Sequence, residues 1–452
     1  MSEIEAASTA GLPPEAAEDW ADCVRAFLAH GRETPAHLDR VLKAAPDFAL
    51  AHAVKGLFLL LLGRSELRAP ATEALAGADA AAARCSQPAA ARLAAVRFAL
   101  ASYIAGRPSV AATRLAAYLQ EAPRDLLIFK LDHAIRFVLG DRRGMLGQSA
   151  PAIIAADGAD PWHGYLLGCH AFALEENGHY REAEEAGRAG LDRVDDDAWG
   201  LHAVAHVFDM TGQAEHGLAW LEARRGAWQH CNNFGGHVWW HLALFHLDRG
   251  DLDAVFALYD EKIRVERTDD YRDISNAASL LSRLEIEGAN VGDRWEELAD
   301  LAEARVEPGC VVFADLHYLL ALNGAGRREA GDRMVARLAE DAARADHDMH
   351  EVAAVAGLPC ATGLAAFRCG QYGLAFEHLR AARPALSRIG GSHAQRDVFS
   401  RLTIEAGLRA GRWAETEDEL RARATRRGAE DGFTARRRAA VARARAAEIA
   451  AE

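Results

Sequence analysis

Apolar positions recur at helical spacing along the chain, and glycines interrupt them at regular intervals. The clearest segment is Gly164–Leu191, GYLLGCHAFALEENGHYREAEEAGRAGL, in which an apolar helix ends at Gly178 and a second helix follows. Few stretches alternate polar residues with β-branched or aromatic ones, as a half-buried strand would. The pattern therefore predicts an all-α chain made of helix–turn–helix units.

The turn glycines mark a repeat. Their spacing runs from 34 residues, between Gly106 and Gly140, to 44 residues, between Gly326 and Gly370. Stacked helix hairpins of the tetratricopeptide type have repeats of this length, and the glycine fits the left-handed position that ends the first helix. The ten markers are Gly63, Gly106, Gly140, Gly178, Gly212, Gly250, Gly288, Gly326, Gly370 and Gly411.

This repeat predicts a tetratricopeptide-like α-solenoid, a superhelix of about ten hairpins whose first helices line a concave face. Small residues such as Ala171, Ala183 and Ala205 lie where neighbouring helices approach closely. We expect residues 1–20 to be an N-terminal extension, residues 21–425 to be the repeat array, and residues 426–452 to form a basic C-terminal helix.

The amino-acid composition and the net charge limit the kinds of partner that the chain can bind. Half of the residues are apolar but only 7% are aromatic, so alanine and leucine dominate, as in helical proteins. The 66 acidic residues outnumber the 52 Lys and Arg, and the net charge is −14. Such a chain repels phosphate backbones and anionic lipids, so we expect no nucleic acid and no membrane as partner. The arginine-rich segment from Arg421 to Arg445 fits a solvated helix face better than an anion-binding patch.

Cysteine usage indicates a reducing compartment. The seven cysteines are scattered and form no C-x-x-C pair, which is typical of free thiols. The N-terminus has no signal-peptide pattern, and the apolar run at Leu57–Leu62 is too short to cross a bilayer. We therefore expect a cytoplasmic protein. Neither glycine-rich phosphate-binding pattern occurs, so no nucleotide cofactor is indicated.

Three motifs are more specific than the repeat itself. They are HAVAHVFDM from His202, GHVWWHLALFHL from Gly236, and GGSHAQRDVF from Gly390. With these motifs the chain resembles the tetratricopeptide repeat protein 38 family, most clearly from Trp162 to Phe399. The resemblance implies a helical-repeat fold and a cytosolic setting, and it implies no particular reaction.

Histidines gather at positions predicted to face the concave groove. In the hairpin that turns at Gly212 these positions include His202, His206 and Asp209. In the next hairpin they include His237 and Trp240, with His241 beside them. His202–His206 and His237–His241 are H-x-x-x-H pairs, which lie on one helix face within reach of one ion.

Such pairs suit a divalent transition metal, because neutral imidazole is its usual ligand and a carboxylate such as Asp209 or Asp315 would complete the set. The pairs lack the glutamate of H-E-x-x-H, which is the general base of many zinc hydrolases. The alternative is structural: buried histidines hydrogen-bond between stacked helices.

A second candidate group lies further along the chain. Gly390–Gly391–Ser392 reads as a loop that enters a helix, where N–H groups and a guanidinium could hold an anion. The alternative is an ordinary N-cap with a salt bridge. The residues of this group are Asp315, His317, His393, Gln395, Arg396 and Asp397.

The sequence thus favours a helical-repeat protein that binds a small polar ligand or a short peptide in a histidine-rich pocket. His237, Trp240, His393, Gln395, Arg396 and Asp397 are its candidate ligand-binding residues. The second hypothesis is an enzyme of hydrolase or lyase type in the same pocket, acting with or without a metal. Its candidate catalytic residues are His202, His206, His241, Asp315 and His317. A protein-interaction scaffold is the third.

Overall fold

The computed structural model describes residues 3–84, 89–156, 158, 160–309 and 311–451. These residues form helices and no strand, and the single isolated β-bridge among them joins Gly31 and Cys231. The predicted all-α repeat fold is confirmed. The α-helices are α1 (Glu3–Ser8), α2 (Pro14–Leu28), α3 (Thr34–Ala44), α4 (Ala49–Leu61), α5 (Arg68–Arg84), α6 (Ala90–Ile104), α7 (Pro108–Glu121), α8 (Leu126–Leu139), α9 (Arg142–Ala155), α10 (His163–Glu176), α11 (Tyr180–Leu191), α12 (Ala198–Met210), α13 (Ala214–Glu222), α14 (Phe234–Arg249), α15 (Leu252–Leu258), α16 (Tyr271–Ile286), α17 (Arg294–Glu303), α18 (Val312–Gly324), α19 (Arg328–Ala342), α20 (Asp348–Val352), α21 (Leu358–Arg368), α22 (Tyr372–Ala382), α23 (His393–Arg409), α24 (Trp413–Arg427) and α25 (Gly432–Ala451).

Four shorter helical elements complete the described chain. Two are 3₁₀ turns, and two are π-helical turns that continue directly from α15 and α20. Single π-turns of this kind occur within longer helices and locally widen them. The four elements are η1 (Ser65–Leu67), η2 (Tyr259–Ile263), η3 (Ala353–Gly357) and η4 (Arg383–Ile389).

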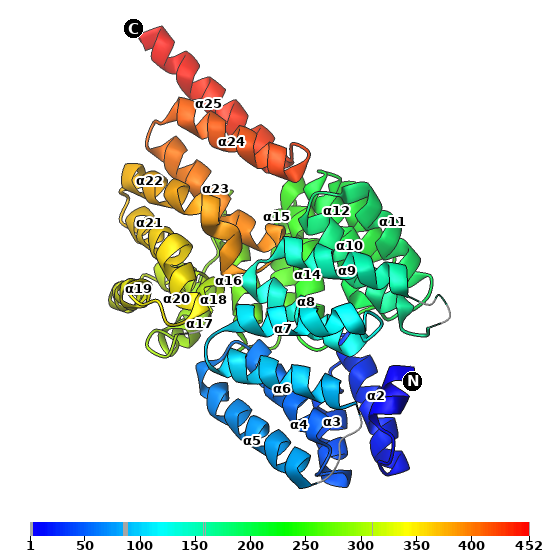
Figure 1. Ribbon diagram of the computed structural model, residues 1–452. Coiled ribbons are helices and arrows are strands. Elements are labelled where there is room, and N and C mark those ends of the chain that lie inside the picture. Colours follow the sequence, from blue (N-terminus) through cyan, green and yellow to red (C-terminus); the bar gives the residue numbers. More distant parts are fainter. Residues whose placement is uncertain (1–2, 85–88, 157, 159, 310, 452) are drawn as a thin grey trace. The chain divides into compact units, whose positions relative to one another are not determined.

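The chain divides into two compact units. Unit 1 comprises residues 1–204, 225–235 and 346–348, and unit 2 comprises residues 205–224, 236–345 and 349–452. Within each unit, helices that follow one another pack as hairpins, as α4 does with α5 and α21 with α22 (Figure 1). Each hairpin also contacts the next, so that apolar faces are buried between neighbouring repeats.

All ten marker glycines adopt the left-handed conformation that the repeat pattern predicts. Their φ values lie between +64° at Gly63 and +87° at Gly288. A side chain is strained there, so glycine is favoured at each turn. The predicted small positions are also packed: Ala171, Ala183 and Ala205 are completely buried.

The two ends of the chain are more integrated than the predicted boundaries imply. Residues 1–20, predicted as an extension, contain α1 and the beginning of α2, and Trp20 is buried in the core of unit 1. The C-terminal helix α25 begins at Gly432 and packs on α24 (Figure 1). By length and composition one helical stretch, Asp348–Arg368, could cross a membrane, but 56% of its apolar window is buried, as in a core helix.

Four described cysteines are buried free thiols: Cys23, Cys169, Cys231 and Cys360. Cys369 is exposed and also free. Cys85 and Cys310 lie outside the described residues. The prediction of free thiols is confirmed for the five that the structure describes.

Candidate functional site

Three histidines meet in the core of unit 2. His206 comes from α12, and His237 and His241 come from consecutive turns of α14. Each offers a ring nitrogen within 4.8 Å of the others. The ring centroids of His206 and His241 are 4.4 Å apart, and those of His237 and His241 are 4.8 Å apart. Three imidazoles at this separation can share one metal ion.

A neighbouring helix fixes the orientation of one of these rings. Nδ1 of His237 lies 3.0 Å from Oδ1 of Asn276 on α16, so Nδ1 carries the proton and donates to the amide oxygen. Nε2 of His237 is then the nitrogen that carries the lone pair. A hydrogen bond of this kind, which sets the tautomer and the ring plane, is the usual companion of a histidine that binds a metal.

The cluster is buried, and two of its three rings are uncharged. His206 and His241 are fully buried, and His237 is 9% exposed. Burial lowers the pKa of His237 to about 3 and the pKa of His241 well below its ordinary value, where the neighbouring His206 adds to the effect. Both rings are therefore neutral at physiological pH, which is the form that coordinates metals.

His202 and Trp240 lie on the predicted helices, and both are buried. His202 belongs to the part of α12 in unit 1, one helical turn before His206, and its ring stacks on Phe172 at 5.7 Å. Trp240 is fully buried in unit 2, and its ring is stacked 5.2 Å from the ring of His237.

The sequence predicted that these side chains face a concave, histidine-rich pocket, and the structure encloses them in the interior. His206, Trp240 and His241 have no exposed surface, because aromatic rings and neighbouring helices enclose them. The site is an interior cluster of unit 2.

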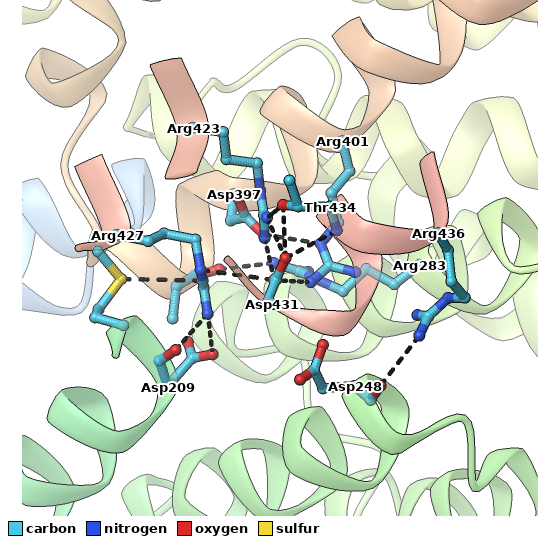
Figure 2. A network of polar contacts seen from close by, with 12 residues as sticks. Asp209, Asp248, Arg283, Asp397, Arg401, Arg423, Arg427, Asp431, Thr434 and Arg436 are labelled. Atoms are coloured by element: carbon cyan, nitrogen blue, oxygen red, sulfur yellow. Dashed lines mark hydrogen bonds and ion pairs between the residues drawn. The ribbon is translucent and has the colours of Figure 1, made fainter. Parts of the chain in front are cut away.

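A network of buried arginines and aspartates lies elsewhere in unit 2, around the start of α25 (Figure 2). Arg423 on α24 is 1% exposed and donates to both Asp397 and Asp431 at 2.7–2.8 Å. Asp431 also accepts from Thr434 and so caps α25. Arg401 pairs with Asp397 at 2.8 Å. Buried charges are stable only when paired in this way.

The same network binds Asp209, one of the predicted metal ligands. Nη2 of Arg427 lies 2.9 Å from Oδ1 of Asp209 and also donates to its carbonyl oxygen (Figure 2). This corrects the expectation that Asp209 completes the histidine set, because its carboxylate is committed to a guanidinium. Arg423 and Arg427 also correct the prediction of a solvated C-terminal arginine face, since both are buried.

The second predicted group of polar residues is dispersed over several sites. Asp315 on α18 is buried, and its carboxylate pairs with Arg337 of α19 at 2.7 Å. Asp397 belongs to the arginine network. His317 is fully buried between Phe313 and Phe399, and its Nδ1 donates to the carbonyl oxygen of Phe313 at 2.7 Å.

The start of α23 is a capping box and not an anion site. Ser392 accepts from the backbone N–H of Gln395, whose side chain accepts from the N–H of Ser392. Arg396 donates to the carbonyl oxygens of Gly390 and Gly391, and its Nη2 lies 3.4 Å from Nδ1 of His393. These contacts occupy the N–H groups and the guanidinium that an anion would need. The prediction of an anion site is therefore wrong, and the alternative, an N-cap, is what the structure contains.

Two polar centres escaped sequence reasoning. In unit 2, Arg283 on α16 is 1% exposed, and its position in an apolar stretch before Leu284 was the one available signal. In unit 1, Nζ of buried Lys130 lies 3.1 Å from Nε2 of His30, 3.5 Å from Sγ of Cys169 and 4.7 Å from the ring centre of Trp199. No spacing in the sequence connects these residues.

No family model matches the chain. Among solved structures, the chain is similar to the human IFIT1 dimer with m7Gppp-AAAA, at 13% identity and a TM-score of 0.36, over 98% of this chain and 96% of that one. It is also similar to a chain of Naa15/Naa10 bound to HypK-THB, at 13% identity and a TM-score of 0.26, over 91% of this chain and 63% of that one. Similarity at this level does not indicate a shared ligand.

Proposed function

We propose that this is a helical-repeat binding protein whose unit 2 holds a divalent transition-metal ion through His206, His237 and His241. The observation that carries the proposal is the convergence of three ring nitrogens within 4.8 Å in a dry interior. A divalent ion can bind a lone pair from each of three imidazoles at this separation. Zinc suits a site of three imidazoles best, and iron, nickel and copper also bind them.

Three protein ligands leave a coordination position for a small polar molecule. This position reconciles the metal with the predicted role of ligand binding. It also favours an enzyme as the second candidate, because catalytic zinc sites have three protein ligands and an open position. The third hypothesis, a protein-interaction scaffold, needs an open groove, and the predicted groove residues Trp240 and His206 are buried.

We further propose the tetratricopeptide repeat protein 38 family and a cytoplasmic location. The family proposal is supported by the motifs HAVAHV and WWHLALFHL, which contain the three proposed metal ligands or flank them. The location is supported by the buried free thiols.

Metal analysis of protein prepared without a histidine tag tests the proposal. We expect about one equivalent of a transition metal for each chain, because buried neutral imidazoles bind such ions tightly. His206→Ala should lose most of this metal. His216→Ala is the matched control, because His216 is an exposed histidine of unit 2 and should leave the metal content unchanged.

The alternative result is equally clear. If the purified protein holds no metal and takes up none from added Zn²⁺ or Co²⁺, the proposal is wrong. The histidines would then be neutral core residues that tie α12 to α14.

A further inference from the structure

Arg283 differs from Arg401, Arg423 and Arg427 of unit 2 because no carboxylate among the described residues is hydrogen-bonded to it. Its Nη1 donates to the carbonyl oxygen of Ser279 at 3.0 Å, and its Nη2 donates to that of Ala394 at 2.6 Å. Its Nε donates to none of the described residues. By contrast, Arg401 and Arg423 each bind at least one aspartate. A buried guanidinium that no carboxylate contacts directly is costly to the folded state.

The pKa values of Arg283 and Arg423 are shifted in opposite directions. Burial and the nearby charge of Arg401 lower the pKa of Arg283 to about 9. Burial also lowers the pKa of Arg423, but the carboxylates of Asp397 and Asp431 outweigh it and raise that pKa well above its ordinary value. The charges of Asp397 and Asp209 raise the pKa of Arg283, but without a direct hydrogen bond they do not outweigh its burial.

A second buried donor lies beside Arg283. The guanidinium carbon of Arg283 is 5.4 Å from the ring centre of Trp240 on α14. The indole Nε1 of Trp240 is buried and finds no hydrogen-bond acceptor among the described residues. Indole N–H groups usually have an acceptor when buried. Two neighbouring helices thus bring unused N–H donors to one region, and an oxyanion is the ligand that accepts from both.

This region adjoins the histidine cluster. The rings of Trp240 and His241 are 4.9 Å apart, and the positive charge of Arg283 acts on His241. A divalent cation at the histidines would be repelled by Arg283 unless an anion lay between them. A bridging anion removes the repulsion and supplies the missing acceptor together.

We infer that the small polar ligand of this protein is a carboxylate, whose oxygens accept from Arg283 and Trp240 and extend toward His241. The position of the ligand beside the histidines rests on the proposed function. The part of the inference that concerns Arg283 and Trp240 rests on their own contacts and does not require a metal.

The experiment is a titration of the full chain with acetate, and with acetamide as the uncharged molecule of the same shape. It is made twice, on protein stripped with a chelator and on protein loaded with Co²⁺. We expect acetate to raise the melting temperature of both forms and acetamide to raise neither, because binding to the folded state stabilises it. In the Co²⁺ form, acetate should also shift the visible absorption of the metal.

The matched variants are Arg283→Gln and Arg436→Gln. Arg436 lies at the start of α25 and pairs with Glu287. Loss of the charged partner should weaken acetate binding about tenfold or more in Arg283→Gln and leave it unchanged in Arg436→Gln. The comparison of acetate with acetamide on the unaltered chain needs no variant, so poor folding of Arg283→Gln does not remove the test.

Equal effects of acetate and acetamide on stripped protein would overturn the inference, as would unchanged acetate binding in a folded Arg283→Gln. A chain that binds no metal but still binds acetate through Arg283 would reject the proposed function and retain the carboxylate site.

Discussion

Asp431 offers the most direct test of how the C-terminal helix is held. Its carboxylate accepts two hydrogen bonds from Arg423, both at 2.7 Å, and two from Thr434, at 2.7 and 2.9 Å. Asp431→Ala removes one partner of a buried ion pair, which costs about 3–5 kcal/mol. It also removes the N-cap of α25, which costs about 1 kcal/mol more. We therefore expect α25 to lose about 4–6 kcal/mol of local stability.

Hydrogen exchange measured by mass spectrometry is the suitable assay, because it reports the opening of one helix within a large protein. Amides of residues 432–451 should exchange about a thousandfold faster in Asp431→Ala, since each 1.4 kcal/mol is a factor of ten. Helices of unit 1 should be unaffected and provide the internal reference.

A second variant separates the ion pair from the cap. In Asp431→Ala with Arg423→Met, the guanidinium that has lost one of its two carboxylates is gone, and Asp397 still has Arg401. We expect about 2 kcal/mol of the loss to be recovered. The reasoning is refuted if α25 exchanges at the original rate in Asp431→Ala, or if the double variant is less protected than the single one.

Three further predictions follow from the same unit. Burial raises the pKa of Asp431, but the charge of Arg423 outweighs it, so the pKa in the folded protein lies well below 3.8. The stabilisation of α25 by the Asp431 carboxylate should therefore be complete above pH 3.8 and disappear as the pH falls toward the folded pKa. Hydrogen exchange at several pH values would detect this loss. Gly432→Ala should weaken the docking of α25, because a Cβ there would lie 2.5 Å from the carbonyl oxygen of Asp248. Gly373→Ala is the control: a Cβ there would have no atom nearer than 4.0 Å, so thermal stability should be unchanged or rise by about 0.5–1 kcal/mol. Ala205→Arg should destabilise unit 2 by about 3 kcal/mol or more in a urea titration, because the methyl group of Ala205 is completely buried. An unchanged urea midpoint would contradict the packing of α12.

The fold was predictable because its signals are local. Each turn glycine, such as Gly212 with φ +67°, is determined by the few residues around it, and the spacing of these turns is visible in the sequence. The clustering of His206 with His237 and His241 followed from the same register, since it needs only two adjacent hairpins.

The partners of the charged residues were not predictable, because a carboxylate pairs with whichever guanidinium the tertiary fold brings near. Asp209 lies 218 positions before Arg427, and no periodicity connects the two. From the sequence, Asp315 could have been a metal ligand, but in the folded chain its carboxylate pairs with Arg337. Ion pairs within one helix are easier to predict. Asp397 and Arg401 are four residues apart, and that spacing predicts their ion pair.

The bond between Asp209 and Arg427 also bears on how the protein is made. A ribosome that has just completed α12 must add the residues up to position 427 before the partner of Asp209 exists, which takes roughly 10–40 s at ordinary elongation rates. During that interval the carboxylate of Asp209 has no guanidinium to meet, and burying it alone would be costly. Unit 2 therefore cannot close its interior repeat by repeat as the chain emerges, and nascent chains arrested before Arg427 should remain open to proteases around α12.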